Sequence, residues 1–197
     1  GVAILSKVLI SKKDHLNWCG FNDTRHISVV LNNKITLHNF YVPAGGDVPD
    51  QETNLKFKHK IKFVNEMTNY FKKDKTKNRM LVGDLNIAPY ENDVWSHKQL
   101  LNVVSHTNIE TNNLKKLLNE GKWVDIMRKF VPLEEKLYSW WSYRNRDWKV
   151  SNRGRRLDHI WLSDSLVSSA KKLYVYKETR DWEKPSDHVP VVLEIEI

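Results

Sequence analysis

Alternation of apolar and polar residues predicts two β-strands in the first part of the chain. It runs over positions 26–31 and 34–42, on either side of Asn32-Asn33. Two asparagines between alternating stretches are typical of a two-residue turn, so we expect an antiparallel hairpin. The apolar residues at positions 2–5 have the pattern of the middle of a buried strand.

A helical repeat follows the hairpin. From Leu55 onward, apolar residues recur at spacings of three and four, at Phe57, Ile61, Val64, Met67 and Phe71. This spacing predicts an amphipathic helix with a solvated face formed by its lysines, Lys58, Lys62, Lys72 and Lys73. A second helix that stops at Gly121 is expected around Ile109, Leu114, Leu117 and Leu118.

The remaining strands are predicted from short apolar runs. Positions 80–82 form a buried strand that opens into a loop at Gly83-Asp84. Aromatic and β-branched runs at 138–143, 157–162, 173–176 and 189–197 make the last third mostly strand. No repeat or linker divides the chain, so we expect one α+β domain over residues 1–197, with sheets packed face to face between helices.

Charge and cysteine content narrow the possible partners and compartment. The formal net charge of +8 favours polyanionic partners. No apolar stretch reaches the roughly 18 residues of a membrane-spanning helix, so no membrane partner is expected. A single cysteine, Cys19, fits a reducing compartment, and we expect a cytoplasmic monomer.

Polar residues with catalytic potential stand at the ends of the predicted strands. Asp84 and Asn86 leave a buried strand two residues apart, where both side chains can point into one site or form an Asx-type turn. Asp158 lies inside an apolar strand, where an unpaired carboxylate would cost several kcal/mol, so it needs a partner such as a histidine. His188 follows Asp187 before the last strand and is a titratable base.

Tyr41 adds an aromatic hydroxyl at the end of the second hairpin strand, where a core or rim aromatic is the simpler interpretation. Each of these signals is weak when taken alone. The ordered set of Tyr-x-Pro, Gly-Asp-x-Asn, Arg-Leu-Asp and Ser-Asp-His, each at a strand edge, is much less expected by chance.

This set resembles the exonuclease III family of the endonuclease/exonuclease/phosphatase superfamily. The matching segments span nearly the whole chain: NFYVP at 39–43, LVGDLN at 81–86, SWWSYR at 139–144, GRRLDHI at 154–160 and WEKPSDH at 182–188. The resemblance implies a four-layer αββα sandwich. It also implies metal-dependent hydrolysis of DNA phosphodiesters, 5′ to abasic sites and from 3′ ends of duplex DNA.

The resemblance assigns roles residue by residue. Asp84 is similar to the residue that orients or deprotonates the attacking water, and Asn86 and Tyr41 to residues that hold the phosphate. His188 resembles the histidine that polarises a phosphate oxygen, and Asp158 the carboxylate that fixes its tautomer. The implied cofactor is Mg²⁺, with Mn²⁺ as a substitute, and the implied ligands are Asp187, Asp84 and Asn86.

A basic segment is the candidate DNA contact. Six basic residues lie between Tyr143 and Leu157 and are interleaved with Trp148: Arg144, Arg146, Lys149, Arg153, Arg155 and Arg156. Such residues neutralise successive phosphates while an aromatic stacks on a base, although a solvated loop has the same composition. Trp140 matches the aromatic wall of the family's abasic-sugar pocket, and the alternative for it is ordinary core. The expected partners are duplex DNA and abasic-site DNA.

The chain also departs from the family pattern. The family's first strand, which contains an Asn, and the following Gln-Glu segment do not appear, and Ala44 replaces an Asn or Gln. We therefore expect the first strands to be missing and little cleavage by these 197 residues alone. Two alternatives stay open, a phosphodiesterase acting on RNA or a small phosphorylated substrate and a non-catalytic DNA-binding fragment.

Overall fold

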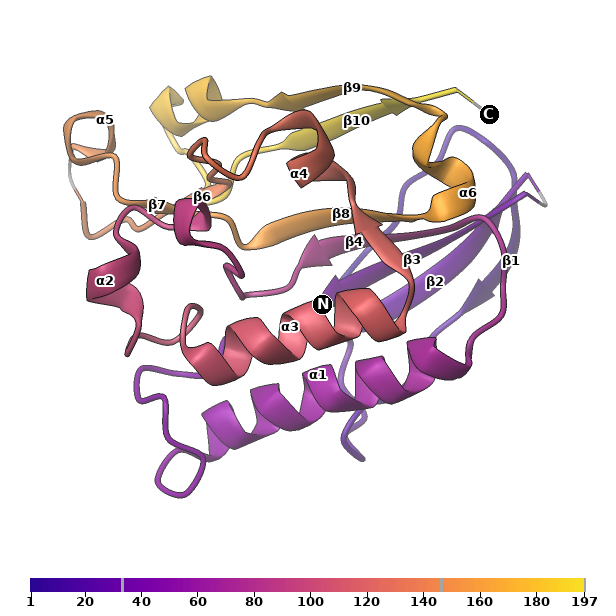
Figure 1. Cartoon of the computed structure of the whole chain (residues 1–197). Helices are drawn as coiled ribbons and strands as arrows, with labels where there is room; N and C mark the ends of the chain where they lie inside the picture. Colours follow the sequence, from indigo (N-terminus) through magenta and orange to yellow (C-terminus); the bar gives the residue numbers. More distant parts are fainter. Residues whose placement is uncertain (33, 146, 197) are drawn as a thin grey trace.

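The computed structural model describes residues 1–32, 34–145 and 147–196, and its centre is a six-stranded mixed sheet (Figure 1). The strands lie in the spatial order β1 (Ile10–Asp14), β2 (His26–Leu31), β3 (Ile35–Tyr41), β4 (Arg79–Asp84), β8 (Asp158–Ser163) and β5 (Trp123–Asp125). β3 and β4 are parallel, and β8 runs antiparallel to β4 and β5.

Two helices cover one face of this sheet, and a separate two-stranded sheet covers part of the other face. Helix α1 (Leu55–Lys73) connects β3 to β4 and packs beside α3 (Asn108–Glu120) (Figure 1). On the opposite face lies the antiparallel pair β9 (Ala170–Val175) and β10 (Val191–Ile195). The α+β class with facing sheets is confirmed.

The other elements are short. They are the strands β6 (Trp140–Trp141) and β7 (Gly154–Arg155), the helices α2 (His97–Leu100), α4 (Ile126–Phe130), α5 (Trp148–Ser151) and α6 (Asp164–Val167), and the 3₁₀ turns η1 (Glu91–Asp93) and η2 (Lys177–Asp181). No helix in the described part of the chain is long and apolar enough to cross a membrane.

Local sequence explains where the two long helices begin. The Asn54 side chain accepts hydrogen bonds from the backbone N–H groups of Lys56 and Phe57 at the start of α1. Thr107 and Glu110 form a capping box at the start of α3. Helix α1 buries its predicted apolar face and packs Phe63 against strand residues such as Phe40. Helix α3 buries Leu114 and Leu117, but the prediction for Ile109 is wrong: it is 37% exposed, and Glu110 is buried beside it instead.

Three details of the sequence prediction are wrong. Residues 2–5 form no strand, because no described strand pairs with this segment. Leu5 is accordingly 92% exposed instead of buried. The hairpin register pairs Leu31 with Ile35, so three residues connect the strands instead of two; Asn33 itself lies outside the described residues. The run at 138–143 contributes only the two residues of β6, and Ile197 at the end of the last run is not described.

Candidate active site

Three neighbouring strands bring the predicted catalytic residues together at one edge of the sheet. In the β3–β4 register Tyr41 lies opposite Asp84, and in the β4–β8 register Asp84 lies opposite Asp158. These residues therefore lie in one row across β3, β4 and β8. Asp84, Asp158 and His188 line a cavity of about 350 Å³ together with Tyr41, which is 36% exposed.

Gly83 allows the close approach of backbones at this row. Its φ is +129°, and a Cβ atom there would lie 2.0 Å from the carbonyl oxygen of Phe40. Any side chain at this position would push β4 away from β3. Glycine is therefore needed immediately before Asp84.

Asp84 and Asn86 form the polar pair that the sequence predicts. The Asn86 amide nitrogen donates to Asp84 Oδ2 and to the Val42 carbonyl, both at 2.9 Å, and the Asn86 backbone N–H donates to Asp84 Oδ1. The pair forms an Asx-type turn, and of its two side chains Asp84 lines the cavity. Burial, together with the nearby Asp158 carboxylate, raises the pKa of Asp84 to about 7.

His188 is the partner of Asp158, as the apolar strand required. Its Nδ1 donates to Asp158 Oδ2 at 2.8 Å, so Nδ1 bears a proton, and its Nε2 lies 3.9 Å from Asp84 Oδ2. Burial alone would lower the pKa of His188. The hydrogen bond and charge of Asp158, with the charges of Asp84 and Asp187, outweigh burial and raise this pKa to about 9.

The strand β6 fixes the segment that contains His188. Trp140 forms a β-bridge with His188, and the Trp140 indole N–H donates to Asp187 Oδ2 at 2.9 Å. The buried Ser139 hydroxyl accepts hydrogen bonds from the backbone N–H groups of Leu157 and Asp158. Trp140 is half-buried beside this site, whereas its neighbour Trp141 is fully buried core.

Lys60 is a residue of this region that the sequence prediction missed. Its side chain is fully buried on α1, where it pairs with Glu110 and donates to the carbonyls of Ala44 and Asn86. These bonds hold the loop in which Asn86 has a φ of +53°. The signal was present, because Lys60 occupies an apolar position in the helical repeat between Phe57 and Val64.

The basic segment divides into exposed and buried residues. Arg144 and Arg153 are exposed, and the Arg153 guanidinium lies over the Trp95 ring at 4.7 Å. Arg155 is half-buried; it donates to Val104 and Ser105 and lies over the Trp140 ring at 5.4 Å. Arg146 lies outside the described residues.

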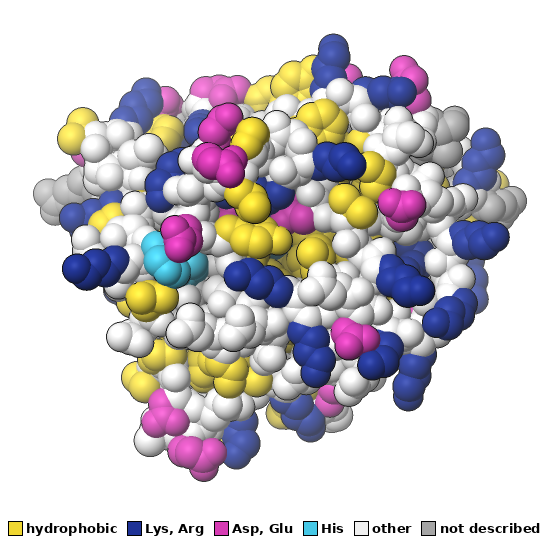
Figure 2. Space-filling view, in the orientation of Figure 1, with side chains coloured by type: hydrophobic (Ala, Val, Ile, Leu, Met, Phe, Trp, Pro, Cys, Tyr) yellow, Lys and Arg dark blue, Asp and Glu magenta, His cyan; other side chains and the backbone are white. Residues whose placement is uncertain are grey.

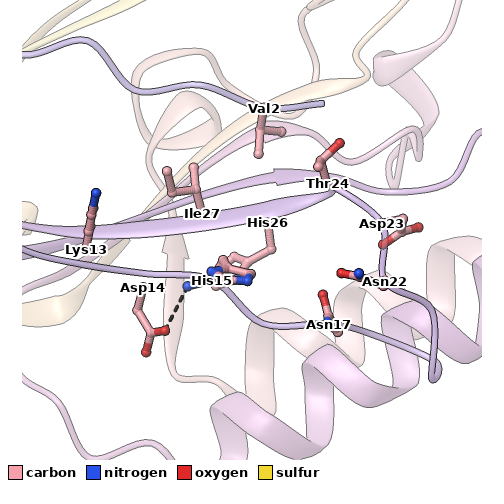
Figure 3. A pocket seen from close by; sticks show the side chains of 10 residues that line it. All are labelled: Val2, Lys13, Asp14, His15, Asn17, Asn22, Asp23, Thr24, His26 and Ile27. Carbon is pink, nitrogen blue, oxygen red and sulfur yellow. Dashed lines mark hydrogen bonds between the residues drawn. The ribbon is translucent and has the colours of Figure 1, made fainter.

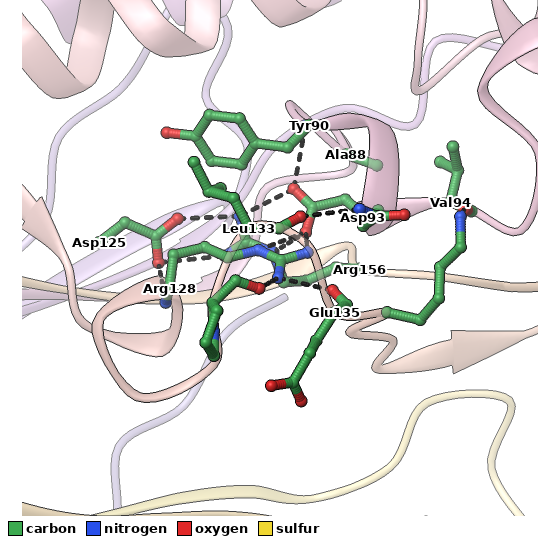
Figure 4. Close-up of polar contacts among 12 residues, drawn as sticks. Ala88, Tyr90, Asp93, Val94, Asp125, Arg128, Leu133, Glu135 and Arg156 are labelled. Carbon is green, nitrogen blue, oxygen red and sulfur yellow. Dashed lines mark hydrogen bonds and ion pairs between the residues drawn. The ribbon is translucent and has the colours of Figure 1, made fainter.

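The prediction that Arg156 contacts DNA is wrong. Its side chain is fully buried and forms two-pronged ion pairs with Asp93 and Asp125 (Figure 4). Arg128 also binds Asp93, at 3.0 Å from its Nε. The guanidinium is neutralised inside the protein and cannot reach a phosphate.

The donor atoms of the implied metal site fit part of a hard-cation site. Asp84 and Asp187 supply carboxylate oxygens, and Asn86 retains its amide oxygen because its nitrogen is already engaged. Oxygen donors are those that Mg²⁺ and Mn²⁺ prefer. No three His, Cys, Asp or Glu side chains in the described ranges are grouped to hold a metal by themselves.

A second cavity, of about 500 Å³, is lined by other residues. It is lined by β1, β2 and the segment between them, including His15, Asn17 and His26 (Figure 3). Val2 lies at its edge, and the segment at 1–3 also lines the candidate site, where the Asn39 amide donates to the Ala3 carbonyl. None of the predicted catalytic residues lines the larger cavity.

Known proteins resemble this chain in sequence and in structure. Exodeoxyribonuclease III of Haemophilus influenzae is 29% identical over 177 residues, which cover 80% of this chain and 60% of that protein. The structure of the 3′ phosphatase NExo from Neisseria bound to product DNA hairpin has a TM-score of 0.87 and 25% identity, covering 98% of this chain and 73% of that one. An AP endonuclease from Archaeoglobus fulgidus has a TM-score of 0.86 and 26% identity with the same coverage.

These comparisons confirm the expected fold and family. The chain spans 60% of the length of the Haemophilus protein, so it matches part of that relative. The family model for endonucleases, exonucleases and phosphatases matches residues 1–188, which include every segment named above. The chain belongs to the Endonuclease/Exonuclease/phosphatase family.

Proposed function

We propose that this chain supplies the hydrolytic site of a DNA-repair nuclease of exodeoxyribonuclease III type. The substrate would be duplex DNA, cut 5′ to abasic sites and shortened from 3′ ends. The observation that supports this most is the row of Asp84 and Asp158 with His188 across three strand ends. The names of the relatives, exodeoxyribonuclease III and AP endonuclease, agree with the proposal.

The two titratable groups have pKa values suited to opposite roles. The pKa of Asp84, at about 7, suits a carboxylate that accepts a proton from the attacking water near neutral pH. The pKa of His188, at about 9, keeps the imidazole protonated, so Nε2 donates to a non-bridging phosphate oxygen. Asp158 holds the imidazole orientation through Nδ1, and the exposed Tyr41 hydroxyl is a further donor to the phosphate.

A divalent cation belongs to the proposed site. Asp84, Asn86 and Asp187 would hold it, together with donors outside the described cluster. Bound Mg²⁺ would offset the negative charge that develops on the phosphate oxygens. Trp140 and the exposed Arg144 and Arg153 would hold the DNA beside this site.

The test is a single-turnover cleavage assay with protein in excess over a labelled abasic duplex. It uses this chain and any longer product of its reading frame, with 3′-phosphate and intact duplexes as further substrates. We expect the longer product to show Mg²⁺-dependent cleavage that EDTA abolishes, and these 197 residues alone to show little cleavage. His188→Ala should slow the chemical step at least about 100-fold with little change in DNA binding.

His15→Ala is the matched control, because His15 is an exposed histidine that lines the other cavity. It should cleave like the parent. Cleavage that persists in EDTA, equal rates for His188→Ala and the parent, or no cleavage of any substrate by either form would contradict the proposed function.

A further inference from the structure

Six exposed lysines gather at the end of the sheet opposite the candidate active site. We name this group the lysine end: Lys34, Lys72, Lys73, Lys75, Lys77 and Lys122. Lys34 and Lys122 immediately precede β3 and β5, and Lys77 lies two residues before β4. The other three lie at the C-terminal end of α1 or just beyond it. Figure 2 shows dark-blue Lys and Arg side chains gathered over this end of α1.

The strands separate this group from the catalytic row. Lys77 precedes β4, whereas Asp84 is the last residue of the same strand. At roughly 3.3 Å per residue, β4 alone spans about 17 Å. Helix α1 runs back along the sheet, so its first residue, Leu55, lies toward the catalytic end and Lys73 toward the lysine end. A phosphate held by His188 is therefore out of reach of the lysine end.

The positive charge at the lysine end is only partly neutralised. Asp74 is paired with Arg79, and Glu120 with Lys72, each at 3.0 Å. A third carboxylate, Asp164, lies beside Lys75, Lys77 and Lys122. Six lysines and Arg79 carry seven positive charges against these three carboxylates, which leaves a net charge of +4 among the ten groups. Repulsion among the positive charges destabilises the folded chain unless a polyanion binds.

The surface here also has the shape and donors for a phosphate group. A hollow of about 270 Å³ is lined by Lys75, Lys77 and Lys122, with the hydroxyl groups of Ser163 and Ser165. Beneath it the Arg79 guanidinium is 4.6 Å from the centre of the Trp123 ring, and its Nε has no hydrogen-bond partner in the described structure. Ammonium and hydroxyl donors are the groups that contact nucleic-acid phosphates without reading sequence.

We propose that the lysine end binds the phosphate backbone of a second segment of DNA, separate from the segment in the candidate active site. That the bound polyanion is DNA rests on the proposed function. A protein that acts on DNA meets further phosphates of the same polymer close to its surface. Binding is sequence-independent, since only loop and helix-end lysines contribute and no element is placed to read a groove.

The experiment is a lysine footprint that does not depend on cleavage. The chain is acetylated with and without a 12-base-pair duplex in EDTA, and protected lysines are identified by mass spectrometry. Lys72 and Lys122 report on the lysine end, while Lys149 and Lys184 report on the candidate active site. We expect protection at both ends, and persistent protection of Lys72 and Lys122 in an Arg144→Ala/Arg153→Ala variant.

A charge-reversed variant tests the lysine end itself. Lys34, Lys75 and Lys77 are exposed and form no ion pair within the described ranges, so changing all three to Glu should preserve the fold. In the Arg144→Ala/Arg153→Ala background, this change should abolish protection of Lys72 and Lys122. It should also make log Kobs against log salt shallower by about two to three units.

The matched control changes Lys56, Lys58 and Lys129 to Glu, since these lysines are exposed, form no ion pair within the described ranges and do not line the hollow. It should retain protection at Lys72 and Lys122. The proposal is overturned if the duplex leaves these lysines unprotected, if the control loses as much protection as the test variant, or if phosphatidylserine vesicles protect them and DNA does not. A failed cleavage assay with an intact footprint would instead contradict the proposed function.

Discussion

At the scale of single residues, Asp158 contributes more than the other nearby carboxylates to the raised pKa of His188. His188 is half-buried, and burial opposes its charge, yet Asp158 holds its Nδ1 proton at 2.8 Å. Because the pKa of His188 is raised to about 9, its contribution to stability is fully present below its ordinary pKa of 6.5 and is lost as the pH rises through 9.

The first prediction is that Asp158→Asn lowers the pKa of His188 by at least about one unit, since burial remains and the hydrogen bond and charge of Asp158 are gone, while Asp84 and Asp187 still attract the imidazolium. An NMR titration of the imidazole resonances in EDTA measures this directly. The same titration of His59, whose pKa is lowered by burial and is not influenced by Asp158, is the internal control and should not change. An unaltered His188 titration would show that Asp158 does not set its charge.

A second residue-scale prediction concerns Arg156. Arg156→Ala leaves Asp93 and Asp125 with a buried, incompletely paired charge, so it should lower the free energy of unfolding by about 3–5 kcal/mol. Urea unfolding measures the change. Arg144→Ala, at an exposed arginine, should stay within about 0.5 kcal/mol of the parent. Equal stability of the two variants would contradict a structural role for Arg156.

At the scale of elements, the basic segment and the His188 segment are tied to each other. Arg180, at the end of η2, is buried and donates to the Ser186 carbonyl. Its guanidinium lies 5.2 Å from the Tyr143 ring, and the Tyr143 hydroxyl donates to Pro185. The proposed DNA-contacting segment is thereby tied to the segment that contains His188.

Two exposed arginines in this segment should contribute through salt-dependent binding. Changing Arg144 and Arg153 to Ala should make log Kobs against log salt shallower by up to about two units, for all duplex sequences alike. A salt titration of duplex binding by fluorescence anisotropy measures this slope. Lys116→Ala/Lys129→Ala, at two exposed lysines that form no ion pair within the described ranges, removes the same charge and should leave the slope nearly unchanged. A slope equal to that of the parent would show that the segment is a solvated loop that does not contact DNA phosphates.

Trp140 should behave differently in the same titration. Its half-buried ring lies beside Asp187 and beneath Arg155, so it offers a face for an extruded sugar and neutralises no phosphate. Trp140→Ala should therefore lower the preference for abasic over intact duplex without changing the salt slope. Equal loss of affinity for both duplexes would mark Trp140 as a packing residue.

At the scale of the whole molecule, buried histidines make stability depend on pH. Burial lowers the pKa of His26 to about 3, of His38 to about 4 and of His159 to about 3. These groups stay neutral in the folded chain while the unfolded chain takes up protons. Their contribution to the stability of the folded chain is present above pH 6.5. It is lost as the pH falls toward the pKa values that these histidines have in the folded state.

We therefore predict a lower free energy of unfolding at pH 5 than at pH 7, with about 2 kcal/mol lost for each of these three histidines. Asp84 acts in the opposite direction, because its raised pKa favours the folded state as the pH falls below 7. Urea unfolding at both pH values in EDTA measures the net loss. His38→Gln should reduce it and Asp84→Asn should enlarge it; a stability that does not change with pH would contradict the prediction.

The sequence by itself determined the elements whose period follows from backbone geometry. The buried face of each of these elements follows from its apolar residues. They recur at helical spacing in α1, alternate with polar residues in β2 and β3, and form a short run in β4. It also determined that Asp158 needs a partner, because an unpaired carboxylate in an apolar strand is costly. Strand β1 escaped prediction because its exposed residues have no apolar alternation.

The tertiary structure decided which basic residues are available to a ligand. Arg153 and Arg156 belong to one local run of basic residues, yet Arg153 is exposed and Arg156 is neutralised by Asp93 and Asp125, 63 and 31 residues away. Local composition cannot show such pairings, because they depend on how distant segments pack. For the same reason, only the folded chain shows that lysines spread over positions 34–122 form one surface, at the end of the sheet opposite Asp84.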